Sequence, residues 1–180
     1  EGTLDFLENK MRPILKGMQE KGIGVEELGY YLHARGAERR NVEMAKRNKK
    51  DPKLQKEMFE GGSGMKTTVA RKYLSDLSPQ KAADFDALAQ QVYDITQLTR
   101  ELLVSEGLET KGTVDAWYRA YGREYVPLMR ELSSFEVNAP GSGEGQGMSV
   151  SGPASKAATG STQENVDHSK ILANVFSQYE

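Results

Sequence analysis

The stretch that decides the fold is FDALAQQVYDITQLTREL, residues 85–102, because an apolar stripe runs through it without a break. The spacing of three or four residues is that of one helix face, and heptad-like spacing also occurs in coiled coils. We favour packing inside a helical bundle over a coiled-coil dimer, since the stripe is short. Ser78 before Pro79 is typical of a helix start, and Gly107 of an end. The stripe consists of Phe85, Leu88, Val92, Ile95, Thr99 and Leu102.

Similar apolar spacing on either side of this helix predicts more helices and no strands. The fold class we expect is all-α, an irregular helical bundle. Residues 52–60 are predicted to form a short polar segment, and Gly61–Gly64 a flexible loop. We expect Trp117, Tyr121 and Tyr125 to form an aromatic cluster. The other predicted helices are 3–22 with a kink at Pro13, 25–48 with a candidate break at Gly36, one after Thr67, and one from Thr113 as N-cap toward Pro127.

The composition changes abruptly after residue 135. Residues 136–167 are rich in Gly, Ser and Ala and contain no aromatic side chain, so they are predicted to form a linker or extended arm. Residues 168–180 resume an amphipathic helical pattern, which needs a partner in this domain or in another one. We therefore expect a helical bundle at 1–135, an arm at 136–167 and a C-terminal docking helix at 168–180. The candidate partner-docking residues are Ile171, Leu172, Val175 and Phe176.

The termini favour a piece of a longer protein. The first residue is Glu1 rather than Met, and the last helix pattern stops at Glu180 without a capping glycine. No apolar run reaches the roughly 20 residues that a membrane-spanning helix needs. Because we expect the chain to be a piece of a longer protein, we expect its function to be only part of the parent's function.

Composition argues against most enzyme classes. The chain has no cysteine, which excludes disulfides, thiolate metal sites and a cysteine nucleophile. Its two histidines, His33 and His168, lie too far apart for a helical metal-binding pair. We expect no catalytic residue, no cofactor site and no metal site, and we interpret His33 as a hydrogen-bonded structural histidine. The net charge of −2 leaves any electrostatic function to a local patch.

Two other patterns have a functional and a structural interpretation. Gly61–Thr68 offers glycines, a lysine and hydroxyls, yet it lacks the spacing of a phosphate-binding loop, and we favour a plain flexible turn. Acidic residues lie on the polar side of the 85–102 helix, and we favour a solvated face over an acid–base pair. These acids are Asp84, Asp86, Glu101, Glu106 and Glu109.

The one local charge feature lies between His33 and Lys56, where nine basic residues face three acidic ones. Glu38 and Glu43 can pair with the neighbouring arginines at helical spacing, so we favour an ordinary salt-bridged face. There are two alternatives. One is contact with a polyanion such as nucleic acid, without regard to its base sequence, and the other is a surface for a protein partner. The candidate contact residues are Arg35, Arg39, Arg40, Lys46, Arg47, Lys49 and Lys50.

Several stretches taken together resemble a known family. The likeness covers most of the chain in the right order, although Met129–Glu131 and Ser161 stand where the usual pattern has Arg-Gly and Arg. The chain resembles the helical region of the large polyvalent proteins of phages and mobile elements. That family includes antirestriction components and internal virion proteins that enter the host with the genome. The stretches are 31–41 with Met44-Ala45, 61–65, 102–108, 117–121 with 125–128, and 157–160 before 171–175.

The resemblance implies an all-helical module without catalytic residues of its own, embedded beside enzymatic domains. The expected function is therefore that of a non-catalytic structural or interaction module of a phage-associated protein, connected with the virion and DNA ejection. Its expected partners are other domains of the parent polypeptide or virion proteins. Its expected location is the virion interior, or the host bacterial cytoplasm after injection. A nucleic-acid-contacting module using residues 33–56 is the alternative.

Overall fold

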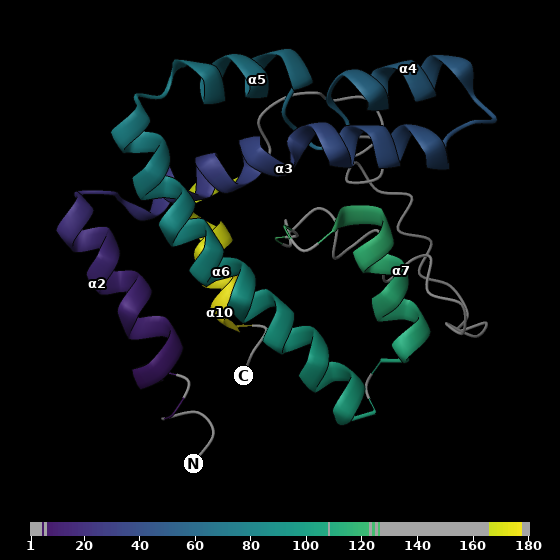
Figure 1. Cartoon of the computed structure of the whole chain (residues 1–180). Helices are drawn as coiled ribbons and strands as arrows, with labels where there is room; N and C mark the ends of the chain where they lie inside the picture. The colour runs from purple at the N-terminus through teal and green to yellow at the C-terminus, as the bar shows by residue number, and fades with distance from the viewer. Residues whose placement is uncertain are drawn as a thin grey trace.

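The computed structural model describes residues 5, 7–107, 109–122, 124, 126 and 166–177. These residues form a helical bundle with no strand among them, which confirms the all-α prediction (Figure 1). Residues 136–165 of the expected arm lie outside this part of the chain, as do Tyr125 and the side chains of Trp117 and Tyr121. None of the helices described is both long and apolar enough to cross a membrane.

The predicted central helix is α6, Pro79–Ser105. The Ser78 side chain caps it by accepting a hydrogen bond from the Lys81 amide at 3.2 Å. Leu88 is 1% exposed and Leu102 is 38% exposed, so the buried part of the stripe ends before the last helical turn. The buried members of the stripe are Phe85, Leu88, Val92, Ile95 and Thr99.

The N-terminal segment forms a π-helical turn η1, Leu7–Met11, which runs into α2, Arg12–Lys21. Pro13 lies in the first turn of α2, where its missing amide hydrogen removes no helical bond, so it starts this helix after a π turn. Gly22 ends α2 with a φ of 64°, a left-handed conformation that glycine adopts without strain. Helix α2 packs against α6.

Helix α3, Val25–Arg47, is continuous through Gly36, so the expected break is absent there. Helix α4, Pro52–Gly61, replaces the polar segment predicted for residues 52–60. That prediction is wrong because Asp51 and Pro52 form a helix start, with the Asp51 carboxylate accepting a hydrogen bond from the Leu54 amide at 3.2 Å. Helix α5, Thr67–Asp76, follows as the sequence predicts.

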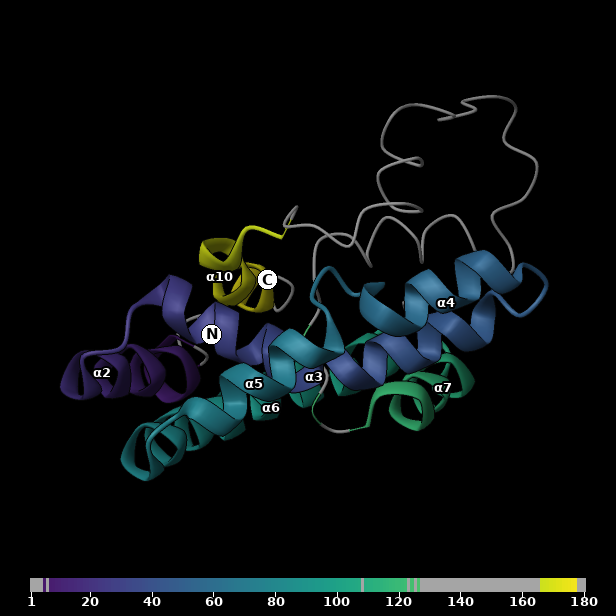
Figure 2. The same ribbon diagram turned by 90° about the horizontal axis from the view of Figure 1, so that it is seen from above.

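Helix α7, Lys111–Tyr121, begins one turn earlier than expected because Thr110, not Thr113, is its N-cap. The C-terminal pattern forms a short 3₁₀ turn η2, His168–Lys170, and then α10, Ile171–Ser177. Helix α3 contacts α4, α5, α6, α7, η2 and α10. Figure 2 shows α10 beside the N-terminal half of α3, with α4 and α7 flanking its C-terminal half.

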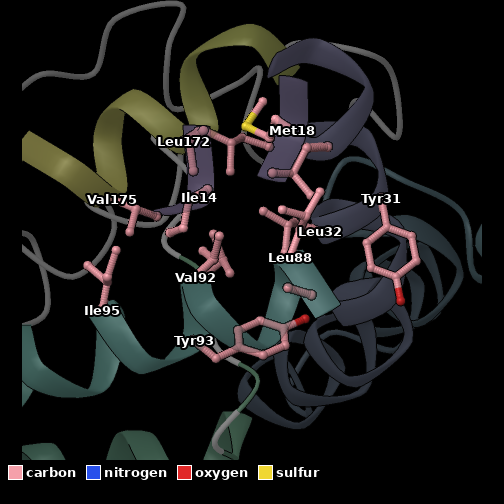
Figure 3. Packing of buried hydrophobic residues seen from close by; sticks show 14 of the residues in the cluster. Ile14, Met18, Tyr31, Leu32, Leu88, Val92, Tyr93, Ile95, Leu172 and Val175 are labelled. Atoms are coloured by element: carbon pink, nitrogen blue, oxygen red, sulfur yellow. The ribbon is translucent and has the colours of Figure 1, made fainter. Parts of the chain in front are cut away.

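The main core lies where α2, α3, α6 and α10 meet (Figure 3). Ile14 from α2, Leu32 from α3 and Val92 from α6 each have at most 1% of their surface exposed. The Tyr31 and Phe85 rings stack at a centroid distance of 4.6 Å and an angle of 6°. Burying side chains of this size contributes about 1.5–3 kcal/mol each, so this cluster dominates the stability of the bundle.

We expect the chain to sediment as a monomer at micromolar concentration. The stripe of α6 is already covered by α2, α3 and α10 of the same chain, so it offers no free seam to a second copy. Sedimentation equilibrium measures this directly. A stable dimer that Leu88→Glu abolished would assign the stripe to an intermolecular interface instead.

Candidate functional site

The polar side chains of α3 are the chemically notable feature of the fold. His33, Arg40 and Asn41 are each at most 2% exposed, which is unusual for such groups unless they have partners. Arg35 and Arg39 flank them on the same helix. We follow each of these side chains to the segment that it contacts.

Asn41 holds the loop between α4 and α5. Its side-chain nitrogen donates to the Met65 carbonyl and to the Thr67 hydroxyl, each at 3.0 Å. Its side-chain oxygen accepts from the Ser63 amide at 2.7 Å. The chain does turn here as predicted, and Gly61, Gly62 and Gly64 are all buried, so the turn is packed against the protein rather than open to solvent. The Asn41 side chain supplies hydrogen bonds that the backbone of an exposed loop would make to water. The backbone N–H of Ser63 already donates to Asn41, so it is not available to bind a phosphate.

His33 binds the same loop and the C-terminal segment. Its Nε2 lies 3.0 Å from the Ser63 carbonyl oxygen, and its Nδ1 lies 2.9 Å from Nε2 of His168. The interpretation of His33 as a hydrogen-bonded structural residue therefore agrees with its geometry. That His168 is its partner was not foreseen, since 135 residues separate the two positions.

Arg35 binds two carboxylates from distant parts of the chain. It donates to Asp86 of α6, to Glu124 after α7 at 2.8 Å, and to the Tyr31 hydroxyl at 2.8 Å. Burial acts to lower the pKa of Arg35, but the hydrogen bonds to Asp86 and Glu124 outweigh it and raise the pKa above its usual value. The Arg35 guanidinium in turn lowers the pKa of Asp86. The sequence places Asp86 on a solvated helix face, and in the structure Asp86 also forms an ion pair with Arg35.

Arg39 and Arg40 bind backbone carbonyls at and after the end of α7. Arg39 donates to the Ala120 carbonyl at 2.9 Å and to the Arg119 carbonyl at 3.2 Å, where a helix leaves its last carbonyls unpaired. Arg40 donates to the Val126 carbonyl. A Cβ added at Gly36 would lie 2.6 Å from the Arg40 guanidinium, so glycine makes room for this side chain.

These contacts divide the basic candidates between His33 and Lys56 into two groups. Arg35, Arg39 and Arg40 all bind acceptors between α7 and Val126, although Arg39 remains exposed while Arg40 is buried. The expected partner Glu38 pairs instead with Arg71 of α5. The sequence could not reveal this division because the acceptors lie about 80–90 residues away, far beyond helical spacing.

The remaining basic candidates gather at the corner between α3 and α4. Lys46, Arg47, Lys49 and Lys50 are exposed there, and Lys46 lies 3.2 Å from the Glu43 carboxylate. Lys53 and Lys56 continue the exposed basic surface along α4. We call the six residues from Lys46 to Lys56 named here the basic corner.

The candidate partner-docking residues lie inside the bundle. Ile171, Leu172, Val175 and Phe176 of α10 are all buried in the main core against α2, α3 and α6 (Figure 3). Their apolar stripe therefore finds its partner within this chain, and the four residues do not form a free docking surface.

A shallow pocket of about 480 Å³, which no sequence pattern indicates, lies between the start of α3, the end of α5 and the start of α6. Tyr30, Tyr73 and Phe85 line it, and burial raises the pKa of Tyr73 to about 12. Lys81 lies at its edge, 2.9 Å from the Glu27 carboxylate. The Lys81 charge is thus already paired.

The described residues contain no group of three or more His, Asp or Glu side chains arranged to hold a metal ion. A scan against protein-family models and searches of curated proteins and of solved structures found no match to this chain.

Proposed function

We propose that the chain is a non-catalytic structural and interaction module of a large phage-associated polypeptide. Its partners are other domains of that polypeptide or virion proteins. It resides in the virion interior, or in the bacterial cytoplasm once it has entered with the genome.

The observation that carries this proposal is the convergence of distant stretches on α3. The segment 31–41 contacts the loop 61–65 through His33 and Asn41. It contacts α7 and Val126 through Arg39 and Arg40. The described parts of four stretches that resemble the large polyvalent proteins therefore meet along α3, namely 31–41, 61–65, 117–121 with Val126, and 171–175.

The chemistry of these contacts supports a structural role. The polar groups of α3 bind backbone carbonyls, a backbone amide, carboxylates and an imidazole that all belong to this chain. Such contacts fix the positions of segments, whereas catalysis requires a nucleophile or an acid–base pair facing a substrate. A rigid helical unit of this kind suits a spacer or assembly surface within a longer protein.

Mass spectrometry of purified, nuclease-treated virions tests the proposal. Trypsin should release the peptide spanning residues 82–100, which lies between Lys81 and the cut after Arg100. We expect this peptide in virions of the phage that encodes the chain, at a constant ratio to the structural proteins. Its absence from virions and from newly infected cells would refute the phage assignment.

A sequence-independent contact with nucleic acid is the second candidate function. The observation in its favour is the basic corner, whose six basic side chains are accompanied by one acid, Asp51, within residues 46–56. Asp51 uses its carboxylate to cap α4. The net charge of −2 opposes long-range attraction of a polyanion, so we keep this function second.

A further inference from the structure

The chain has two histidines, and the fold brings them into direct contact. Their ring centroids lie 5.2 Å apart, with an angle of 33° between the planes. His33 is 1% exposed, and His168 is partly exposed. A hydrogen-bonded pair of imidazoles, one of them buried, is a place where the protonation state can decide whether two segments stay together.

The partners of His33 fix the protons of the neutral pair. The Ser63 carbonyl oxygen can only accept, so Nε2 of His33 carries the hydrogen and donates. A neutral imidazole has one donor and one acceptor, and Nδ1 of His33 is therefore the acceptor. It follows that Nε2 of His168 donates to Nδ1 of His33 across the 2.9 Å contact.

The first added proton leaves this arrangement intact. It binds to Nδ1 of His168, and the hydrogen bond to His33 becomes charge-assisted and stronger. A second proton must bind to Nδ1 of His33, which is the acceptor of that bond. Two N–H groups and two positive charges would then face each other, and the contact must open.

The contact lies next to the segment that carries the terminal helix. His168 belongs to η2, which leads directly into α10, and both pack against α3. The backbone of His168 lies so close to α3 that a Cβ added at Gly29 would be 2.0 Å from its carbonyl oxygen. Loss of the histidine contact therefore acts on the docking of η2 and α10.

We propose that His33 and His168 form an acid-released clasp for the terminal helix α10. The clasp stays closed with no proton or one proton added to the pair, and it opens when both imidazoles are protonated. Opening exposes the core face of α10 and the apolar surface of α3 and α6 that it covers.

One tyrosine lies against this pair, and a second tyrosine packs on the first. Tyr30 of α3 lies 5.0 Å from the His168 ring, and the Tyr73 ring of α5 contacts Tyr30 at 4.7 Å. Because burial raises the pKa of Tyr73 to about 12, this hydroxyl does not ionise in the acid range.

In the described part of the chain, Asp167 and Lys170 of η2 and its cap are charged groups beside His168. Lys170 lies 3.8 Å from the Asp167 carboxylate. The Ser169 hydroxyl lowers the pKa of Asp167, and the charge of His168 acts in the same direction. Asp167 therefore remains ionised while the histidines, which ordinarily titrate near pH 6.5, take up protons.

Nuclear magnetic resonance of the ¹⁵N-labelled chain between pH 8 and pH 4 tests the clasp, since only two imidazole spin systems are present. We expect two protonation steps more than about one pH unit apart, with both rings responding to the first, as in coupled titrations. Hydrogen-exchange protection of residues 171–177 should persist through the first step and be lost in the second. Protection of Val92 and Ile95 in α6 should remain, which separates release from global unfolding.

His168→Gln is the informative variant. A glutamine amide can donate to Nδ1 of His33 when that atom is bare and can accept from it when it is protonated. We expect residues 171–177 of this variant to stay protected down to pH 4. Loss of protection at the same pH as in the unchanged chain, or independent titration of both rings near pH 6.5 with α10 still docked, would overturn the proposal.

Discussion

Leu88→Ala is expected to lower the free energy of unfolding by about 3–5 kcal/mol, the upper part of the range for truncation of a fully buried leucine. Leu88 is 1% exposed, and a Cβ added at Gly17 of α2 would lie 3.1 Å from its Cδ2 atom. Leu88 thus packs directly against α2, and its truncation removes the side chain that fills the space between the two helices. Urea denaturation monitored by circular dichroism measures the loss.

Leu102→Ala is the matched control, because Leu102 belongs to the same helix and the same sequence stripe but is 38% exposed. We expect it to cost less than about 1 kcal/mol. Equal losses for the two variants would mean that the stripe is not buried as the structure has it.

Gly29→Ala is expected to displace the C-terminal helix from the bundle. The added Cβ would lie 2.0 Å from the backbone carbonyl oxygen of His168, a contact that no rotamer change can relieve. Undocking exposes the buried side chains of α10, and losing the burial of even two of them costs about 3–6 kcal/mol. Hydrogen exchange of residues 171–177 should lose its protection, and the urea midpoint should fall.

Gly24→Ala provides the control, since a Cβ at Gly24 meets nothing within 4 Å and its φ of −82° suits any residue. We expect exchange in α10 to be unchanged in this variant. If Gly29→Ala also left α10 protected, the close approach of η2 to α3 would be disproved.

Patterns local in sequence predicted the helices well. Helix α6 was predicted because its apolar residues recur over many turns, and its start because Ser78 and Pro79 form a recognisable cap. The same kind of signal occurs at Asp51 and Pro52, but the residues that follow are polar and lack a clear apolar stripe, which favours a short polar segment at 52–60. Helix α4 could therefore be predicted from the sequence, because the helix start at Asp51 and Pro52 is a stronger signal than the polar composition of the residues after it.

The polar contacts of α3 could not be predicted from the sequence. Asn41 and His33 looked like ordinary helix residues, and what gives them a role is a loop and a terminal segment that fold back onto them. The nine basic residues between His33 and Lys56 suggest an exposed face when they are read along the sequence. In the fold, however, Arg40 is only 2% exposed. Contacts over 80 residues or more depend on tertiary packing, which a single sequence does not encode as a visible pattern.

Arg35, Arg39 and Arg40 of α3 bind acceptors within this module, and we expect the exposed basic corner to stay solvated rather than bind a nucleic acid. Fluorescence anisotropy with a labelled DNA duplex, repeated at several salt concentrations, tests it most directly. We expect no binding tighter than about 10⁻⁴ M at physiological salt, the weak end of non-specific affinity. Submicromolar binding whose salt dependence weakens when Lys46, Lys49, Lys50 and Lys53 are all replaced by Gln would contradict the account and assign the basic corner to a polyanion.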